Sequence, residues 1–227
     1  MAIRALVFDV FGTLVDWRSA ISRTFAASGL QVDSDELADD WRARYVPILR
    51  EVNEQARPWG DFDELHHATL EALLADRGLE LDSEARDKLV GAWHALDPWP
   101  DVRSGLEELR SDRVVATLSN GHVALLVDLA RHGDLRFDCV LSAEFARAYK
   151  PAAVVYQTAA RLLCLEPDEV MLVACHPWDL AGARKAGLRS ALVNRPLEYG
   201  PGSPAREDPE ADHVVDDLHE LAASLRD

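Results

Sequence analysis

The chain has 227 residues, of which 48% are hydrophobic and 28% charged, a balance typical of folded soluble proteins rather than of disordered ones. Its formal net charge of −16 argues against nucleic acid or an anionic membrane surface as a partner, because both are bound through clustered Lys and Arg. A small anionic ligand is not excluded, but its site must supply local positive charge.

Targeting signals and cysteines add little to this picture. No apolar run approaches the roughly 20 residues that cross a bilayer. Residues 1–14 lead directly into a strand-like segment and lack the features of a signal peptide. The 3 cysteines are odd in number and match no metal-binding spacing, so we expect no disulfide framework. We therefore expect a cytoplasmic protein.

Short apolar runs along the chain predict buried strands. The first, Ile3–Phe8, stops at Asp9 and is followed by a turn at Gly12. The further predicted strands are 114–118, 139–141, 170–174, 190–193 and 213–215. Helical patterns separate most of these runs, such as the one from Val123 that Gly133 closes. This alternation predicts an α/β fold, with a Rossmann-like, mainly parallel sheet and helices on both faces.

One stretch, 17–96, shows helical patterns only, with apolar residues at spacings of three and four. Such stripes can simply pack on the core. We prefer the interpretation of a helical cap at 15–97, inserted after the first strand, over a core formed by 1–14 and 98–227. A further segment, 199–209, is rich in Gly and Pro and predicts a surface loop. Within the cap we expect N-caps at Ser34 and Ser83 and helix ends at Gly29 and Gly78. Pro47 should kink the longest helix.

Polar residues follow four of the predicted strands. They are Asp9, Ser119-Asn120, Lys150 and, a few residues further on, Asp179. Each alone could be an ordinary turn, cap or solvated residue. Ligands of an open parallel sheet bind beyond the carboxyl ends of its strands, where all four would meet. We therefore favour a shared site over coincidence.

These residues lie in segments that resemble the four motifs of the haloacid dehalogenase superfamily, and the details most resemble its L-2-haloacid dehalogenase branch. The resemblance covers nearly the whole chain, including the helical cap. The segments are Asp9-Val10-Phe11-Gly12-Thr13-Leu14, Ser119-Asn120-Gly121, Lys150-Pro151 and Trp178-Asp179.

Two positions favour a dehalogenase over a phosphatase of the same superfamily. Phe11 stands where the phosphatases carry a second Asp that protonates the leaving alcohol. Cys175 stands where they carry an acidic ligand for magnesium, a hard cation that prefers oxygen. Without the general acid and the magnesium ligand, phosphoryl transfer would be slow. Displacement of a halide needs neither group, because a halide leaves without a proton. We therefore expect no cofactor and no metal in the reaction.

The resemblance implies a covalent mechanism. Asp9 attacks the carbon bearing the halogen and forms an ester, while Lys150 keeps the Asp9 carboxylate ionised. Ser119 holds the carboxylate of a small 2-haloacid. Arg42, after Trp41 in the cap, and Asn120 donate to the halide, although Arg42 could equally be a solvated helix residue.

The remaining site residues serve a dry pocket and the hydrolysis of the ester. Phe11 and Trp178 exclude water from the pocket, although Trp178 could instead be a core residue. Asp179, Thr13 and His176 orient or deprotonate the water, and Lys150 with backbone N–H groups stabilises the oxyanion. The 2-hydroxy acid is the expected product.

The sequence departs from the branch at several positions and leaves alternatives open. The branch usually has Tyr, Ser and Asn where Phe11, Ala174 and His176 stand. His176 could activate or position the water, or only fill space. A small-molecule phosphatase and a non-catalytic binding protein stay as alternatives, and a homodimer is compatible with the sequence.

Overall fold

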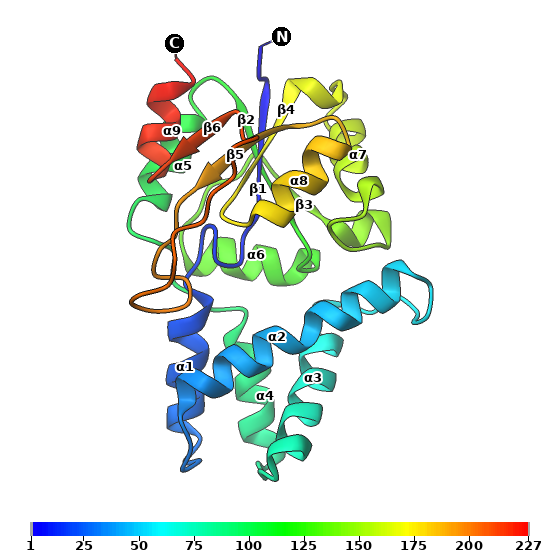
Figure 1. Cartoon of the computed structure of the whole chain (residues 1–227), viewed down its shortest axis with the longest axis vertical. Helices are drawn as coiled ribbons and strands as arrows, with labels where there is room; N and C mark the ends of the chain where they lie inside the picture. The colour runs from blue at the N-terminus through cyan, green and yellow to red at the C-terminus, as the bar shows by residue number, and fades with distance from the viewer. Residues whose placement is uncertain (1, 227) are drawn as a thin grey trace.

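A six-stranded parallel sheet forms the upper half of the molecule, in the order β3-β2-β1-β4-β5-β6 (Figure 1). The computed structural model describes residues 2–226. The strands are β1 (Ala5–Phe8), β2 (Val114–Ser119), β3 (Cys139–Ser142), β4 (Val170–Ala174), β5 (Arg189–Val193) and β6 (His213–Val215). All six predicted strands are present, with bounds within two residues of those expected. The α/β Rossmann-like fold predicted from the sequence is confirmed.

The first strand is the centre of the sheet. β1 pairs with β2 and β4, and all four of its residues are buried. Its last residue, Phe8, lies beside Thr117 and Val173. Because these strands run in the same direction, Asp9 emerges between the carboxyl ends of two neighbours.

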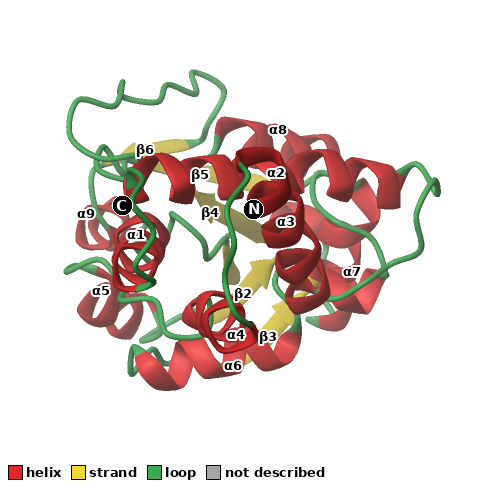
Figure 2. Cartoon of the chain, turned by 90° about the horizontal axis from the view of Figure 1, so that it is seen from below, coloured by secondary structure: helices red, strands yellow, loops and turns green. Residues whose placement is uncertain are grey.

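Helices cover both faces of the sheet. Figure 2 shows α7 and α8 on one side and α5, α6 and α9 on the other. Two 3₁₀ turns, η1 (Ala143–Ala146) and η2 (Pro167–Glu169), precede α7 and β4. The bounds of the helices are α5 (Val102–Leu109), α6 (Val123–His132), α7 (Ala153–Leu162), α8 (Pro177–Lys185) and α9 (Leu218–Ser224). Among residues 2–226, the structure has no helix with the length and apolar character of a membrane span.

Four helices between β1 and α5 lie below the carboxyl edge of the sheet, where the cap was expected (Figure 1). They are α1 (Trp17–Ala27), α2 (Ser34–Asn53), α3 (Phe62–Arg77) and α4 (Ser83–Ala92). We call them the helical insert. Backbone hydrogen bonds from Asp16 to Asp97 and from Trp99 to Leu14 join the outgoing and returning chains at 2.9 and 3.0 Å. The exact division at 15–97 stays a prediction.

The ends of the insert helices differ slightly from the predicted ones. The N-caps are Asp33 and Asp82, each one residue before the expected Ser34 and Ser83, because it is the Asp carboxylate that accepts from N–H groups in the first turn of each helix. Gly78 ends α3 in the left-handed region, as predicted. Gly29 follows the last capping residue of α1, and α2 continues through Pro47 to Asn53.

The packing of α5 on α9 predicts an unusual effect for one glycine. A Cβ at Gly105 would overlap the buried side chain of Leu218 at the start of α9. We expect Gly105→Ala to destabilise the protein by about 1–3 kcal/mol through overpacking, although Ala is the better helix former. The matched control is Gly91→Ala in α4, where a Cβ meets nothing within 4 Å. In urea unfolding, Gly91→Ala should leave the free energy of unfolding unchanged or raise it by up to about 1 kcal/mol. Equal changes in the free energy of unfolding for Gly105→Ala and Gly91→Ala would contradict this account.

Candidate active site

Asp9 begins the turn that follows β1, and the shape of that turn requires a glycine. Gly12 has a φ of +83° and lies against the carboxylate of Glu198, so that any Cβ there would overlap it. The turn folds the chain back on Asp9, and Thr13 Oγ1 donates to Asp9 Oδ2 at 2.8 Å. Cys175 N–H donates in turn to Thr13 Oγ1 at 3.0 Å and fixes the hydroxyl. The nucleophile candidate is therefore held by its own turn.

Lys150 connects Asp9 to the fourth motif. Its Nζ lies 3.1 Å from Asp9 Oδ1 and 2.6 Å from Asp179 Oδ2, and all three side chains are buried. Tyr156 Oη donates to the other oxygen of Asp179 at 2.6 Å. The backbone N–H of Lys150 donates to Asn120 Oδ1 at 2.7 Å, which ties the second motif to the third. The sequence prediction that these residues meet at one edge of the sheet agrees with this geometry.

The buried charges shift one another's proton affinities. Burial acts to raise the pKa of Asp9, but the ammonium of Lys150 and the hydrogen bond from His176 lower it well below its usual range. Burial and the charge of Asp9 raise the pKa of Asp179 despite the opposing effect of Lys150. Burial acts to lower the pKa of Lys150, and its two carboxylate partners outweigh this and raise it. Asp9 is thus ionised at neutral pH, and Asp179 is the stronger base.

His176 lies between two carboxylates. Its Nδ1 is 3.1 Å from Asp9 Oδ2 and its Nε2 is 3.1 Å from Glu198 Oε1. Carboxylates only accept hydrogen bonds, so both ring nitrogens carry a proton and the ring is an imidazolium. Burial opposes this charge, but Cys175, Glu198 and Asp9 raise the pKa of His176 well above its ordinary value. As an imidazolium, His176 can donate a proton but cannot accept one.

Glu198 is a site residue that the sequence analysis missed. It is 1% exposed and accepts from Trp17 Nε1 at 3.0 Å as well as from His176. Arg206 forms an ion pair with Glu198 and donates to the carbonyl oxygen of Cys175 at 3.0 Å. Burial acts to raise the pKa of Glu198, and His176 and Arg206 lower it to about 2. Arg206 belongs to the expected surface loop 199–209, so that segment also supports the site.

An aromatic layer of the insert covers Phe11. Its ring centroid is 5.8 Å from that of Phe62 and 5.9 Å from that of Trp93. Arg42 lies over the ring of Tyr45 at 4.3 Å, and its Nε and Nη1 are buried without a hydrogen-bond partner in the described residues. His66 stacks on Trp93 at 4.3 Å, and both of its ring nitrogens are likewise buried and unpartnered. The insert therefore supplies unused donors beside the apolar residue of the first motif.

The other predicted substrate-binding residues lie around this layer. Ser119 is fully buried, and its Oγ accepts from Gly121 N–H at 3.2 Å. The oxygen of the Asn120 amide is used by Lys150, and no hydrogen bond joins its Nδ2 to another described residue. Trp178 is 48% exposed and stacks on His176 at 5.7 Å. The core interpretation of Trp178 is thus wrong, because the first turn of α8 directs this ring outward from the sheet.

Sequence signals for the missed residues are weak. Tyr156 and His66 fit the apolar faces of their helices, where an aromatic ring normally serves packing alone. Glu198 directly precedes the Gly- and Pro-rich loop 199–209 and Arg206 lies within it, and charged residues at such positions are usually solvated. Only the fold brings Tyr156, Glu198 and Arg206 into the network of charges around Asp9. It places His66 in the aromatic layer.

The donor set around Asp9 does not fit magnesium. Both oxygens of Asp9 already accept from cationic groups, Lys150 and His176, and the neighbouring Cys175 is a soft ligand. Cys175, His176 and Glu198 do bring three ligand atoms within 4.8 Å of one another. Their nitrogen and oxygen atoms are engaged in the ion pairs described above.

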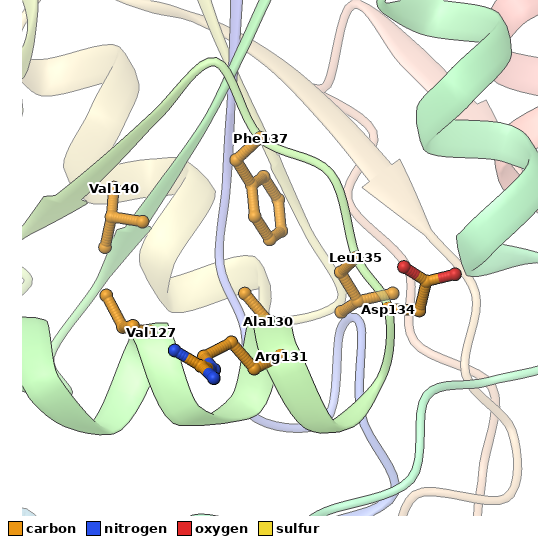
Figure 3. Close-up of a pocket in the computed structure, with 7 residues that line it drawn as sticks. All are labelled: Val127, Ala130, Arg131, Asp134, Leu135, Phe137 and Val140. Carbon is orange, nitrogen blue, oxygen red and sulfur yellow. The ribbon is translucent and has the colours of Figure 1, made fainter.

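An open hollow on the surface of the core lies away from these residues. Figure 3 shows it between α6 and the segment that leads to β3, with a volume of about 310 Å³. Apolar side chains and two surface charges line it: Val127, Ala130, Arg131, Asp134, Leu135, Phe137 and Val140. None of the motif residues contributes to it, so its size does not identify the site.

Comparisons with known proteins bear on the family and the fold of the chain. The sequence model of the haloacid dehalogenase-like hydrolases matches residues 3–187. The chain belongs to this family. It is 34% identical over 206 residues to (S)-2-haloacid dehalogenase 4A of Burkholderia cepacia, with 87% of each chain covered. The family resemblance predicted from the motifs is confirmed.

Solved structures of family members superpose along the whole chain. The crystal structure of an L-2-haloacid dehalogenase shares 44% identity, with a TM-score of 0.93 over 99% of this chain and 100% of that one. The L-2-haloacid dehalogenase of Xanthobacter autotrophicus, solved with chloropropionic acid covalently bound, shares 28% identity with a TM-score of 0.85. The coverage is 99% of this chain and 98% of that structure.

The position of His176 between two carboxylates predicts a measurable coupling. Glu198→Gln removes one of its anionic partners, so we expect the pKa of His176 to fall. NMR titration of ring-labelled histidine measures this pKa, and Glu210→Gln, an exposed carboxylate of the same loop, is the control. An unchanged pKa of His176 in Glu198→Gln would refute the coupling.

The same pair sets a pH window for stability. The pKa of His176 is raised, so its contribution is complete below its unfolded pKa of 6.5 and is lost as pH rises through the folded value. The pKa of Glu198 is lowered, so its contribution is complete above 4.5 and is lost as pH falls towards about 2. In urea unfolding experiments, Glu198→Gln should move the alkaline limit of this window to lower pH, because the pKa of His176 falls. It should also remove the loss of stability that protonation of Glu198 causes at acid pH.

Proposed function

We propose that the chain hydrolyses the carbon–halogen bond of a small 2-haloacid, through an ester on Asp9, to give the 2-hydroxy acid. The observation that carries the proposal is the ionised carboxylate of Asp9, held by Lys150, Thr13 and His176. The relatives named above are 2-haloacid dehalogenases, and one was solved with a haloacid covalently bound.

The hydrogen bonds of Asp9 distinguish its two oxygens. Oδ2 accepts from both Thr13 and His176, whereas Oδ1 accepts from Lys150 alone. Oδ1 therefore keeps the freer lone pair, and we assign it as the nucleophile. It attacks the carbon bearing the halogen from the side opposite the halide. The C–O bond forms as the carbon–halogen bond breaks, with inversion at a chiral carbon.

The substrate and the leaving halide are held by separate donors. Ser119 and nearby backbone N–H groups hold the carboxylate of the substrate. Arg42 and the Nδ2 of Asn120 bind the halide, because their N–H groups include donors without a hydrogen-bond partner among the described residues. His66 adds a further unpartnered ring on the same side. Phe11 and the rings packed on it keep water away from the first step, and Trp178 forms the outer rim.

Water then attacks the carbonyl carbon of the ester. Oδ2 of Asp9 becomes the oxyanion, and the Thr13 hydroxyl and the His176 imidazolium donate to it. Oδ1 leaves with the product as an alkoxide, which the ammonium of Lys150 next to it stabilises and which takes up the proton that Asp179 accepts from the water. Asp179, whose pKa is raised, accepts the proton of the water. This assignment makes His176 an electrostatic donor rather than a base.

Asp9→Asn tests the covalent step. We expect loss of halide release from chloro-, bromo- and fluoro-acids, because an amide is a very weak nucleophile, while thermal unfolding stays cooperative. The unmodified enzyme, run for a single turnover in ¹⁸O-water with a chelator present, should carry the label in the Asp9 carboxylate. Mass spectrometry of the peptide measures this. Label in the product alone would mean that water attacks the substrate directly.

Arg42→Ala tests the halide site. The loss of a donor to charge that grows in the transition state should lower the turnover rate by about 10²–10³-fold. The matched control is Arg44→Ala on the same helix. It breaks a surface ion pair with Asp76, and we expect it to leave turnover unchanged. The loss should be largest for fluoride, which needs the most hydrogen-bond help. Equal losses for all halides, together with a lower melting temperature, would leave Arg42 as a structural residue.

A further inference from the structure

A cluster of ligand-type side chains lies where the helical insert meets the core, outside the residues assigned to the reaction. Asp63 is in the first turn of α3, His94 follows α4, and His122 precedes α6. Their ligand atoms lie within 4.8 Å of one another. Two of the three residues belong to the insert and one to the core.

The carboxylate of Asp63 stands between the two imidazoles. Its Oδ1 is 2.9 Å from His94 Nε2, and its Oδ2 is 3.7 Å from His122 Nε2. Two ligands bound to one tetrahedral metal at about 2.0–2.1 Å lie about 3.3 Å apart, so both separations are close to those of a metal site. Small side-chain rotations are enough to bring all three atoms around one ion.

The ring of His122 favours a missing ligand over a plain ion-pair cluster. His122 is 8% exposed, and neither of its ring nitrogens has a hydrogen bond to another described residue. Buried imidazole nitrogens are normally satisfied, and Nε2, 3.7 Å from Asp63 Oδ2, is the nitrogen that an ion held by Asp63 would satisfy. Within residues 2–226, the ion-pair partners of Asp63 are these two histidines, with no Lys or Arg to neutralise it.

The other nitrogen of His94 has the partner that a metal ligand requires. Its Nδ1 lies 2.8 Å from Asp128 Oδ2 on α6. A histidine that binds a metal through one nitrogen usually donates its other N–H to a carboxylate, which fixes the ring and raises its basicity. Asp128 occupies that position.

We propose that Asp63, His94 and His122 form a binding site for a divalent transition metal such as Zn²⁺, with Asp128 orienting His94. Two imidazole nitrogens and one carboxylate suit Zn²⁺ and are poor ligands for Mg²⁺ or Ca²⁺. The remaining coordination position is left for water. The ion joins the insert to the core and takes no part in the reaction on Asp9.

The site is connected to the aromatic layer through the neighbours of its ligands in sequence. Phe62 and Trp93, next to Asp63 and His94, contact the ring of Phe11. Gly121, next to His122, has that same ring at a distance where a Cβ would touch it, 3.0 Å. Metal binding therefore fixes the position of the insert over the first motif.

Zinc binding to the full, untagged chain tests the proposal. Isothermal titration of chelator-treated, dialysed protein with Zn²⁺ should show one ion per chain, and Co²⁺ should give the absorption bands of a low-symmetry site with nitrogen ligands. His94→Gln and His122→Gln should weaken binding by at least tenfold. Asp128→Asn, which leaves all three ligands in place, should weaken it by about 10–100-fold.

Controls separate this site from other histidines and from the buried cysteine cluster. His132→Gln removes a surface histidine that is paired with Asp97 alone, and it should bind zinc like the unmodified chain. Cys175→Ser should also retain zinc binding. If this variant lost zinc binding, the ion would lie beside Glu198 and the proposal would be overturned. Absence of zinc binding to the unmodified chain would overturn the proposal as well. So would His94→Gln and His122→Gln variants that bind zinc as tightly as the unmodified chain and whose circular dichroism spectra show that they are folded. None of these readouts depends on halide release.

Discussion

The structure of the site depends on one buried ammonium group shared by two carboxylates. Lys150 has a 1% exposed side chain and lies between Asp9 and Asp179. Removing any one of these charges would leave an uncompensated charge out of contact with water, which is far more costly than the loss of a surface ion pair. The second, third and fourth motifs are therefore held in one arrangement around the first.

Charge balance explains why the site extends beyond the motifs. Asp9, Asp179 and Glu198 are matched by Lys150, His176 and Arg206, so that three anions meet three cations. An imidazolium at position 176 needs a second carboxylate, because Asp9 is already shared with Lys150. Glu198 provides it, and Arg206 offsets the remaining charge of Glu198. The chain as a whole is strongly acidic, yet this region is locally balanced.

The sequence was sufficient for the fold and for the residues at the strand ends, because both follow from hydrophobic periodicity and from where parallel strands finish. The contacts of Asp9, Lys150 and Asp179 needed only the common direction of the strands. Glu198 could not be found in this way, since a glutamate before a Gly- and Pro-rich loop gives the pattern of a solvated residue. Helix starts were misplaced by one residue because Asp and Ser adjoin at both N-caps, and the pattern does not rank them.

The central position of β1 has a consequence for folding. This strand and Asp9 are synthesised well before their partners, because the strands that pair with β1 begin at Val114 and Val170 and the charged groups furthest along the chain in this region are Glu198 and Arg206. The sheet is therefore built from contacts distant in sequence, which slows folding compared with local contacts. A nascent chain carries Asp9 long before it carries the cations that hold it. The carboxylate of Asp9 acquires its full environment only when translation has passed Arg206.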